Sequence, residues 1–121
     1  MNAGDTYRRE GSSHVYVVVS DPALDGENVV VVNFTSNKAW QDQSCLLMLG
    51  EHPFITEETV LFYAKARIHC NRELDTALAS GRLTLHDPVS DAVLAKIRAG
   101  ARDSDRLPFK MKQILEEQGL I

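Results

Sequence analysis

Two valine-rich runs near the start of the chain give its clearest pattern of apolar positions. They cover residues 14–20 and 28–34, and the segment between them contains Asp21-Pro22 and Asp25-Gly26. β-branched side chains suit the pleated surface of a strand, and Asp-Pro and Asp-Gly pairs favour turns. The pattern therefore predicts two neighbouring antiparallel strands joined by a loop.

Two further runs extend the strand prediction to residue 70. Residues 44–49 are largely apolar, and residues 60–68 alternate so that Tyr63, Lys65 and Arg67 fall on one face and apolar residues on the other. Alternation with a period of two is typical of a half-buried strand. We expect a strand there that exposes a basic and aromatic face.

After residue 70 the apolar spacing becomes helical. Leu74 and Leu78 follow Asn71, a candidate N-cap, and Asp87-Pro88 precedes apolar residues at intervals of four. Pro is favoured at the first helical position, and this spacing indicates one buried face. Three helices are predicted, and the apolar stripes of the second and third contain Val89, Val93 and Ile97, and Leu107, Met111, Ile114 and Leu115.

About five short strands followed by helices favour a mainly β (α+β) fold. A strongly bent antiparallel sheet that closes into a small barrel buries one apolar face of each strand, and the C-terminal helices can then cover a side or an end. The chain has 121 residues, of which 44% are hydrophobic, which suits one core. We expect a single domain over residues 1–121, with residues 1–70 as the barrel and residues 71–121 as a helical extension packed on it.

The charge and hydropathy of the chain limit the choice of partners and location. The formal net charge is -4 and the sequence pI is about 5.5, so any contact with nucleic acid must use a local basic patch. No apolar run is long enough to span a bilayer, and residues 1–11 lack the apolar stretch of a signal peptide. These features predict a cytoplasmic protein without a membrane partner.

Two cysteines and two histidines raise the question of a zinc site. Cys45, His52, His69 and Cys70 include suitable ligand types, but no Cys-x-x-Cys or His-x-x-x-His pair is present. Adjacent residues on a strand also point to opposite faces, which separates His69 from Cys70. We therefore expect neither a metal nor another cofactor.

The first half to two-thirds of the chain resembles the PemK/MazF family of toxin endoribonucleases. The likeness rests on Gly4-Asp5 before the first apolar strand, on the second strand, and on Thr35-Ser36 directly after it. His14-Val15 stands where the family has Arg-Pro, and Thr35 takes the place of its hydroxyl residue. The resemblance implies an SH3-like barrel, cleavage of single-stranded RNA without a metal, a homodimer, and an antitoxin protein as partner.

Such cleavage needs a base for the ribose 2′-hydroxyl, an acid for the leaving oxygen and cations for the phosphate. His14 is the candidate base or acid, because an ordinary imidazole titrates near pH 6.5, and Thr35 is a candidate hydroxyl donor to the phosphate. The remaining candidates would hold the substrate by charge, by hydrogen bonding or by stacking on bases, and they are Arg8, Arg9, Ser36, Lys38, Trp40, Tyr63, Lys65 and Arg67.

Each candidate also has a simpler interpretation. His14 can cap the strand, Thr35-Ser36-Asn37 can form a turn through local hydrogen bonds, and Trp40 can close the barrel mouth. Because His14 replaces an arginine of the family pattern, the chain can also be a non-catalytic SH3-like module that binds a protein or a nucleic acid. Toxicity on expression favours the enzyme, and normal growth without cleavage products favours the module.

Overall fold

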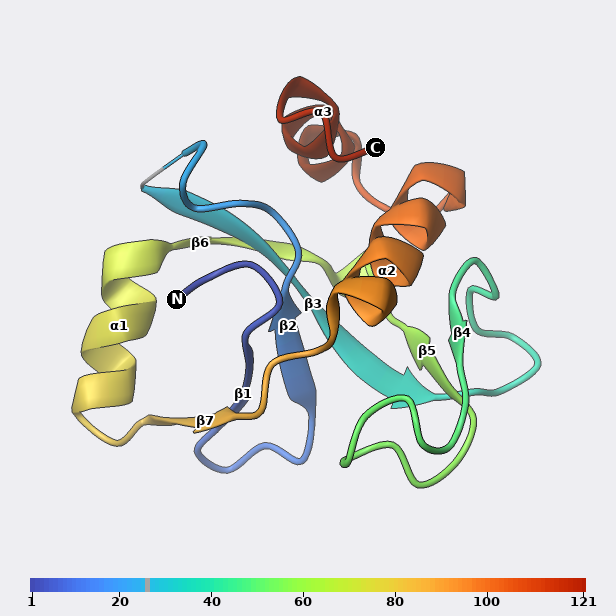
Figure 1. Cartoon of the computed structure of the whole chain (residues 1–121), viewed down its shortest axis with the longest axis horizontal. Helices are drawn as coiled ribbons and strands as arrows, with labels where there is room; N and C mark the ends of the chain where they lie inside the picture. Colours follow the sequence, from blue (N-terminus) through green and yellow to red (C-terminus); the bar gives the residue numbers. More distant parts are fainter. Residues whose placement is uncertain (26) are drawn as a thin grey trace.

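The computed structural model describes residues 1–25 and 27–121, so the predicted turn at Asp25-Gly26 includes a residue outside the described part. The protein has an α+β fold around one mostly antiparallel sheet (Figure 1). The strands are β1 (Thr6–Arg9), β2 (Val15–Val18), β3 (Asn28–Ser36), β4 (Leu46–Leu47), β5 (Thr59–Leu61), β6 (Arg67–Cys70) and β7 (Leu83–His86). The helices are the short 3-10 helix η1 (Tyr63–Lys65) and the α-helices α1 (Asn71–Ala79), α2 (Asp91–Asp103) and α3 (Phe109–Glu117).

Strand β3 is the longest strand and organises the sheet. Its first part pairs with β6 and its last part with β5 on one side, and β2 pairs on the other side. The strand order is β4-β5-β3-β2-β1-β7, with β6 off this path. Among the described strands, β4 and β7 end the order without pairing with each other, so the predicted closed barrel is wrong.

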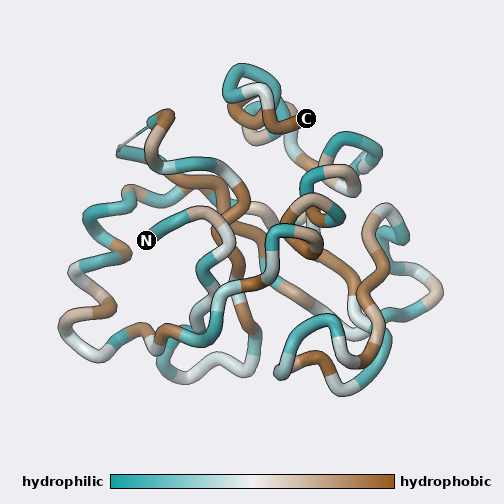
Figure 2. Tube along the Cα trace, in the orientation of Figure 1, coloured by the Kyte–Doolittle hydropathy of each residue, from teal (hydrophilic) through white to brown (hydrophobic). Residues whose placement is uncertain are grey.

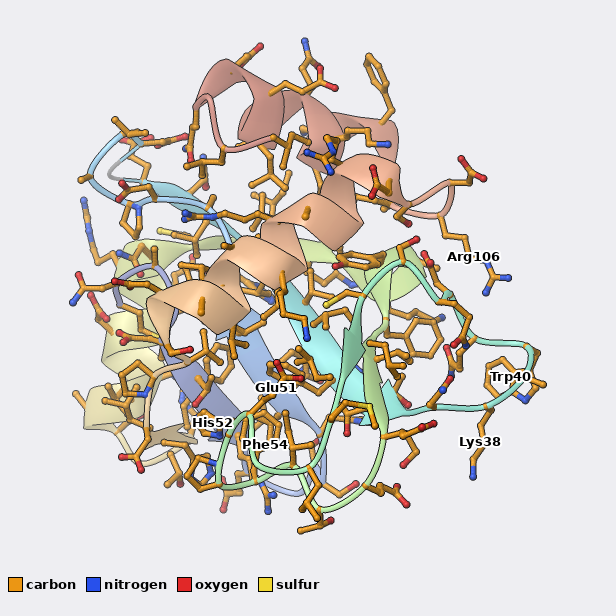
Figure 3. All side chains as sticks on the ribbon, turned by 45° about the vertical axis from the view of Figure 1, so that its right-hand side comes forward. Lys38, Trp40, Glu51, His52, Phe54 and Arg106 are labelled. Atoms are coloured by element: carbon orange, nitrogen blue, oxygen red, sulfur yellow. The ribbon has the colours of Figure 1, made fainter. Side chains whose placement is uncertain are left out.

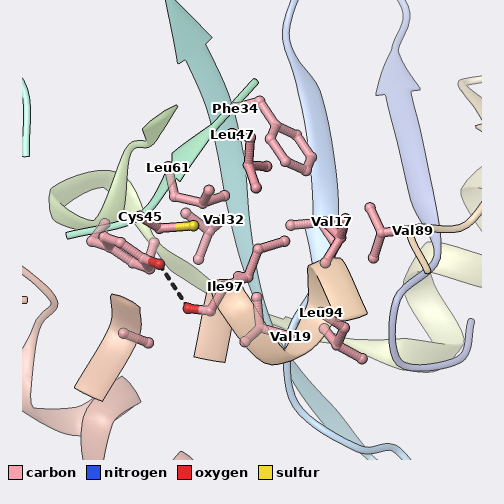
Figure 4. Packing of buried hydrophobic residues seen from close by; sticks show 14 of the residues in the cluster. Val17, Val19, Val32, Phe34, Cys45, Leu47, Leu61, Val89, Leu94 and Ile97 are labelled. Atoms are coloured by element: carbon pink, nitrogen blue, oxygen red, sulfur yellow. Dashed lines mark hydrogen bonds between the residues drawn. The ribbon is translucent and has the colours of Figure 1, made fainter. Parts of the chain in front are cut away.

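Helices cover both faces of the sheet, which explains why it does not close on itself. On one face, α2 supplies Leu94 and Ile97 to the larger core (Figure 4). On the other face, α1 supplies Leu74 to a second cluster that contains Val29 and Val31 of β3. A strand buried on both faces reads as a continuous apolar run, and Figure 2 shows such runs through the sheet. Closure into a barrel is not needed when two layers of helix bury these faces.

The predicted hairpin strands are confirmed, but the strand predicted over residues 60–68 is wrong. Strands β2 and β3 pair antiparallel with Val17 opposite Val32. The later run divides into β5 and β6, with η1 between them. The break occurs where the Tyr63 hydroxyl donates a 2.7 Å hydrogen bond to the carbonyl oxygen of Ile97 in α2. A turn that buries Tyr63 against α2 interrupts the expected alternation.

Two strands lie in segments that the sequence does not mark as strands. Strand β1 pairs with β2 and with β7, although its sequence ends in Arg8-Arg9 and lacks an apolar run. Strand β7 lies between α1 and α2, inside the region expected to be only helical. Both strands are short and obtain their stability from pairing with each other, which a local pattern does not reveal.

The three predicted α-helices are present with small shifts at their ends. Helix α2 begins at Asp91 rather than at Pro88, because the side chain of Ser90 caps it and accepts a 3.1 Å hydrogen bond from the Val93 amide. Ile97 and Leu115 are fully buried, as their apolar spacing predicts. In the described chain, no helix has the length and apolar character that a bilayer crossing requires.

Candidate functional site

Helix α1 covers only part of its face of the sheet, and the remainder forms an open groove of about 320 Å³. Side chains from β1, η1 and β6 give this groove its positive charge, namely those of Arg9, Lys65 and Arg67, and the approach to β2 and β6 itself add the imidazoles of His14 and His69. Tyr16, Asn33 and Phe62 complete the lining. We refer to this set of eight residues as the basic groove.

Strand register explains why these side chains share one face. Tyr16 lies opposite Tyr7 on β1 and opposite Asn33 on β3, and directly opposed residues point to the same side of a sheet. On the far side of β3, Val31 lies opposite Arg67 and Val29 opposite His69. Because side chains alternate along β3, Asn33, Val31 and Val29 point to one face. Arg67 and His69 of β6 therefore lie on the same face as Tyr16.

The basic groove is a local positive patch on an acidic protein. Of the described residues that line it, none is Asp or Glu, whereas the whole chain carries a formal charge of -4. Arg9, Lys65 and Arg67 are exposed at its edges. Clustered cations in a concave surface attract phosphate groups, so the groove provides the local basic patch that nucleic-acid binding requires.

His69 lies deeper in the groove than the cations. It is partly buried on β6, and burial together with the positive charges of Arg9 and Arg67 lowers its pKa below the ordinary value of 6.5, against the opposing effect of Glu73. All of the larger influences favour the uncharged imidazole. At neutral pH, His69 therefore has a ring nitrogen free to accept a proton.

The segments around His14 and Thr35 meet at the same end of the sheet, as the sequence predicts. The β2–β3 ladder ends at Tyr16 opposite Asn33, and each candidate lies just beyond it. His14 is exposed and lines the basic groove with Arg9 and Arg67. Thr35 pairs with Val60 of β5 and is partly exposed, but it does not line the groove. The structure therefore brings His14 to the cations and leaves Thr35 at the margin.

Tyr63 and Arg8 are not placed as predicted. Tyr63 is fully buried, its hydroxyl is bonded to the Ile97 carbonyl, and burial raises its pKa. Its ring is not exposed to stack on a base, so that prediction is wrong. Arg8 points to the opposite face from Arg9, where it lines a small cavity of about 90 Å³ with His52 and His86. Neighbouring strand residues point to opposite faces, so only one of the two arginines reaches the groove.

Lys38, Trp40 and Ser36 lie outside the basic groove. Lys38 and Trp40 project from the loop between β3 and β4 (Figure 3), and Trp40 is 66% exposed. This placement contradicts the expectation that Trp40 closes a barrel mouth. The loop is fixed by a 2.9 Å hydrogen bond from Arg106 to the Trp40 carbonyl oxygen. Ser36 donates a hydrogen bond to the Glu57 carboxylate instead.

Of the four residues considered as zinc ligands, only His69 and Cys70 lie together, as neighbours on β6. Cys45 is buried in the larger core, where burial raises its pKa to about 11. His52 is buried on the same side, with Nε2 2.7 Å from the Asp87 carbonyl oxygen, whereas His69 lines the basic groove. In residues 1–25 and 27–121, no three His, Cys, Asp or Glu side chains form a group suited to a metal ion.

The residues that the sequence does not single out for RNA chemistry are His69, Tyr16, Phe62 and Asn33. His69 and Asn33 come from β6 and β3, which meet only through long-range pairing, so their common location follows from register rather than from a motif. A comparison with models of protein families finds no match, and a comparison with curated proteins finds none either.

Proposed function

We propose that the protein binds single-stranded RNA in the basic groove and cleaves it without a metal ion. The observation that supports this proposal is the presence of two histidines, His14 and His69, among three cationic side chains in one groove. Two imidazoles can act as base and acid, and the cations can stabilise charge on the phosphate. The proposal agrees with the activity that the family resemblance implies.

The reaction can be assigned to the groove residues. Uncharged His69 takes the proton of the ribose 2′-hydroxyl, and the 2′-oxygen attacks the adjacent phosphorus. The bond from phosphorus to the 5′-oxygen breaks, and His14 donates a proton to that oxygen. The products are a 2′,3′-cyclic phosphate and a 5′-hydroxyl. Arg9, Lys65 and Arg67 stabilise the negative charge that develops on the phosphate oxygens.

Aromatic residues in the groove support a single-stranded substrate. Tyr16 and Phe62 are partly exposed and line the groove, and stacking on an aromatic ring contributes about 1–3 kcal/mol per base in single-strand binders. They replace Trp40 and Tyr63 as the stacking candidates. The cytoplasmic location, the homodimer and the antitoxin partner stay predictions of the sequence and of the family resemblance.

A non-catalytic RNA-binding module is the second candidate function. It is favoured by the position of Thr35, which does not line the basic groove, and by His14 in place of the arginine in the family pattern. Binding through Arg9, Lys65 and Arg67 needs no proton transfer, so the same groove serves both functions. Cleavage products distinguish the two.

Cleavage is tested by incubating the purified protein with a long RNA in the presence of a chelator. We expect fragments that carry cyclic phosphate ends, and we expect His14→Ala to lower the cleavage rate by about 10²–10⁴-fold because an acid is lost. Thr35→Ala is expected to slow cleavage if its hydroxyl reaches the phosphate. Trp40→Ala, on the exposed loop, is the control and should cleave normally. Unchanged cleavage by the His14→Ala variant would show that His14 is not the general acid. If the wild-type protein leaves the RNA intact, the binding module is favoured.

Binding through the cations predicts a defined dependence on salt. Replacing Lys65 or Arg67 with Gln should weaken binding of single-stranded RNA similarly for all sequences. Each change should also reduce the slope of log affinity against log salt by about 0.7, the contribution of one phosphate contact. Arg72→Gln removes an exposed charge of α1 that does not line the groove and serves as the control. If the slope of all three variants equals that of the wild-type protein, RNA binds outside the basic groove.

A further inference from the structure

A second cavity of about 470 Å³ lies beside the basic groove, on the side of α1 and β7. Arg9 and His69 line both cavities, so the two cavities adjoin on this face of the sheet. The buried residues Leu74 and Leu83 provide an apolar part of the lining. The charged part contains Glu10, Glu73 and Arg82 in addition to Arg9. We call this second cavity the mixed-charge pocket.

The charged groups of the mixed-charge pocket are available to a ligand. Within the described residues, neither Glu10 nor Glu73 has a cationic nitrogen within 4.0 Å of its carboxylate. Arg82 donates from Nε to the Ser80 hydroxyl at 3.0 Å, which leaves the terminal nitrogens at the other end of its guanidinium group. Two carboxylates and two guanidinium groups therefore surround an apolar surface without neutralising one another in ion pairs.

We propose that the mixed-charge pocket binds a guanine base of the RNA whose phosphate lies in the basic groove, an inference that rests on the proposed function. Guanine has two neighbouring donors, N1–H and the N2 amino group, which match the two oxygens of a carboxylate. It also has two neighbouring acceptors, O6 and N7, which match a guanidinium group. Adenine, cytosine and uracil lack a pair of adjacent donors. The pocket offers carboxylates and guanidinium groups together.

The position of the pocket relates base recognition to the site of cleavage. Glu73 belongs to the first turn of α1 and is close enough to His69 to influence its pKa. A base bound near Glu73 would thus have its own phosphate beside His69 and Arg9, the two residues that both cavities share. Leu74 and Leu83 can pack against the planar purine, and Glu73 and Arg82 can read its edges.

Guanine recognition is tested with 2′-O-methyl decanucleotides, which lack the attacking hydroxyl. One contains a single guanosine among uridines, a second contains inosine at that position, and a third contains uridine only. Fluorescence anisotropy should show about tenfold tighter binding of the guanosine probe than of the uridine probe, the equivalent of one or two good hydrogen bonds. Inosine lacks the N2 amino group and should lose most of this preference.

The variant that tests the contact is Glu73→Gln, which keeps the size of the side chain but replaces one acceptor oxygen with a donor. It should abolish the difference between guanosine and inosine and leave binding of the uridine probe unchanged. Glu116→Gln, an exposed substitution on α3, should retain the difference. Equal binding of all three probes by the wild-type protein would overturn the guanine pocket and leave RNA binding intact. A guanosine preference that survives in both Glu73→Gln and Glu10→Gln would also overturn it. Binding of none of the probes would overturn the proposed function together with this inference.

Discussion

Replacing His69 with Gln is expected to reduce RNA cleavage by about 10²–10⁴-fold, the usual effect of losing a general base. His69 is the histidine whose pKa is lowered by its surroundings in the groove, so at neutral pH it is ready to accept a proton. Affinity for a 2′-O-methyl RNA should change little, because the three cations remain. The measurement is the rate of cleavage at saturating enzyme, together with the affinity for the inert RNA.

The pH dependence of the cleavage rate distinguishes loss of the base from other causes of a slow reaction. A base must be deprotonated and a general acid protonated, so wild-type cleavage should rise with pH along an acidic limb and fall again where the acid has lost its proton. The midpoint of the rise should lie below the ordinary histidine value of 6.5. In the His69→Gln variant, this rise should disappear from the residual activity. The lowered pKa also means that the unfolded chain binds more protons than the folded one below pH 6.5. The contribution of His69 to stability is therefore fully present above that pH and is lost as pH falls through the folded-state pKa.

The matched control is His86→Gln. His86 lies opposite Thr6 in the β1–β7 pair and lines the small cavity on the other face of the sheet. It should alter neither the rate nor the pH profile. A His69 variant that keeps both the wild-type rate and its acidic limb would contradict the assignment of the base. Melting temperatures of the variants near that of the wild type exclude unfolding as the cause of any loss.

Gly100→Ala is expected to destabilise the protein by about 2–4 kcal/mol, through overpacking and the loss of a buried hydrogen bond. Gly100 is buried on α2. A Cβ atom there would collide with the Tyr63 hydroxyl and would lie 2.6 Å from Cβ of Cys45 and 3.0 Å from the Ser44 carbonyl oxygen. Helix propensity alone predicts the opposite sign, a gain of about 1 kcal/mol. The melting temperature should fall by roughly 10 °C for a chain of this size.

A double-mutant cycle with Tyr63→Phe identifies the source of this cost. Removing the hydroxyl opens part of the space that the new methyl group needs, so Gly100→Ala should cost less free energy of unfolding in that background. The Cys45 contact remains, so the relief should be partial. A higher melting temperature for the Gly100→Ala single variant would show that α2 can move away from the sheet without loss and would contradict the close packing.

The parts of the fold that local pattern predicts are those whose signal lies in a few consecutive residues. The valine runs of β2 and β3 and the apolar stripe of α2 are of this kind, and the structure contains all three. Local pattern does not predict whether the sheet closes into a barrel. The same valine pattern arises from one buried face in a closed sheet or from two buried faces in an open sheet. Only the positions of α1 and α2 on opposite faces distinguish these possibilities.

The candidate site shows the same limit. Residue type and nearness to the end of the hairpin suggest His14 and Arg9, and the alternation of residues 60–68 suggests Lys65 and Arg67. All four line one groove. His69 carries no local signal for this role, because its position depends on the pairing of β6 with the first part of β3. The prediction for Tyr63 is wrong because a single strand over residues 60–68 would expose its side chain, whereas the turn at η1 buries it.

The hydrogen bond from Tyr63 to Ile97 has a consequence for communication between the two sides of the molecule. Tyr63 and Lys65 belong to the same short turn, and Ile97 is at the centre of α2. The backbone that presents Lys65 to the basic groove is thereby tethered to a helix on the reverse side. A ligand or a substitution that displaces α2 would loosen this tether and shift Lys65. Under the proposed function, such a change would weaken the affinity for RNA from a distance, without contact with any nucleotide.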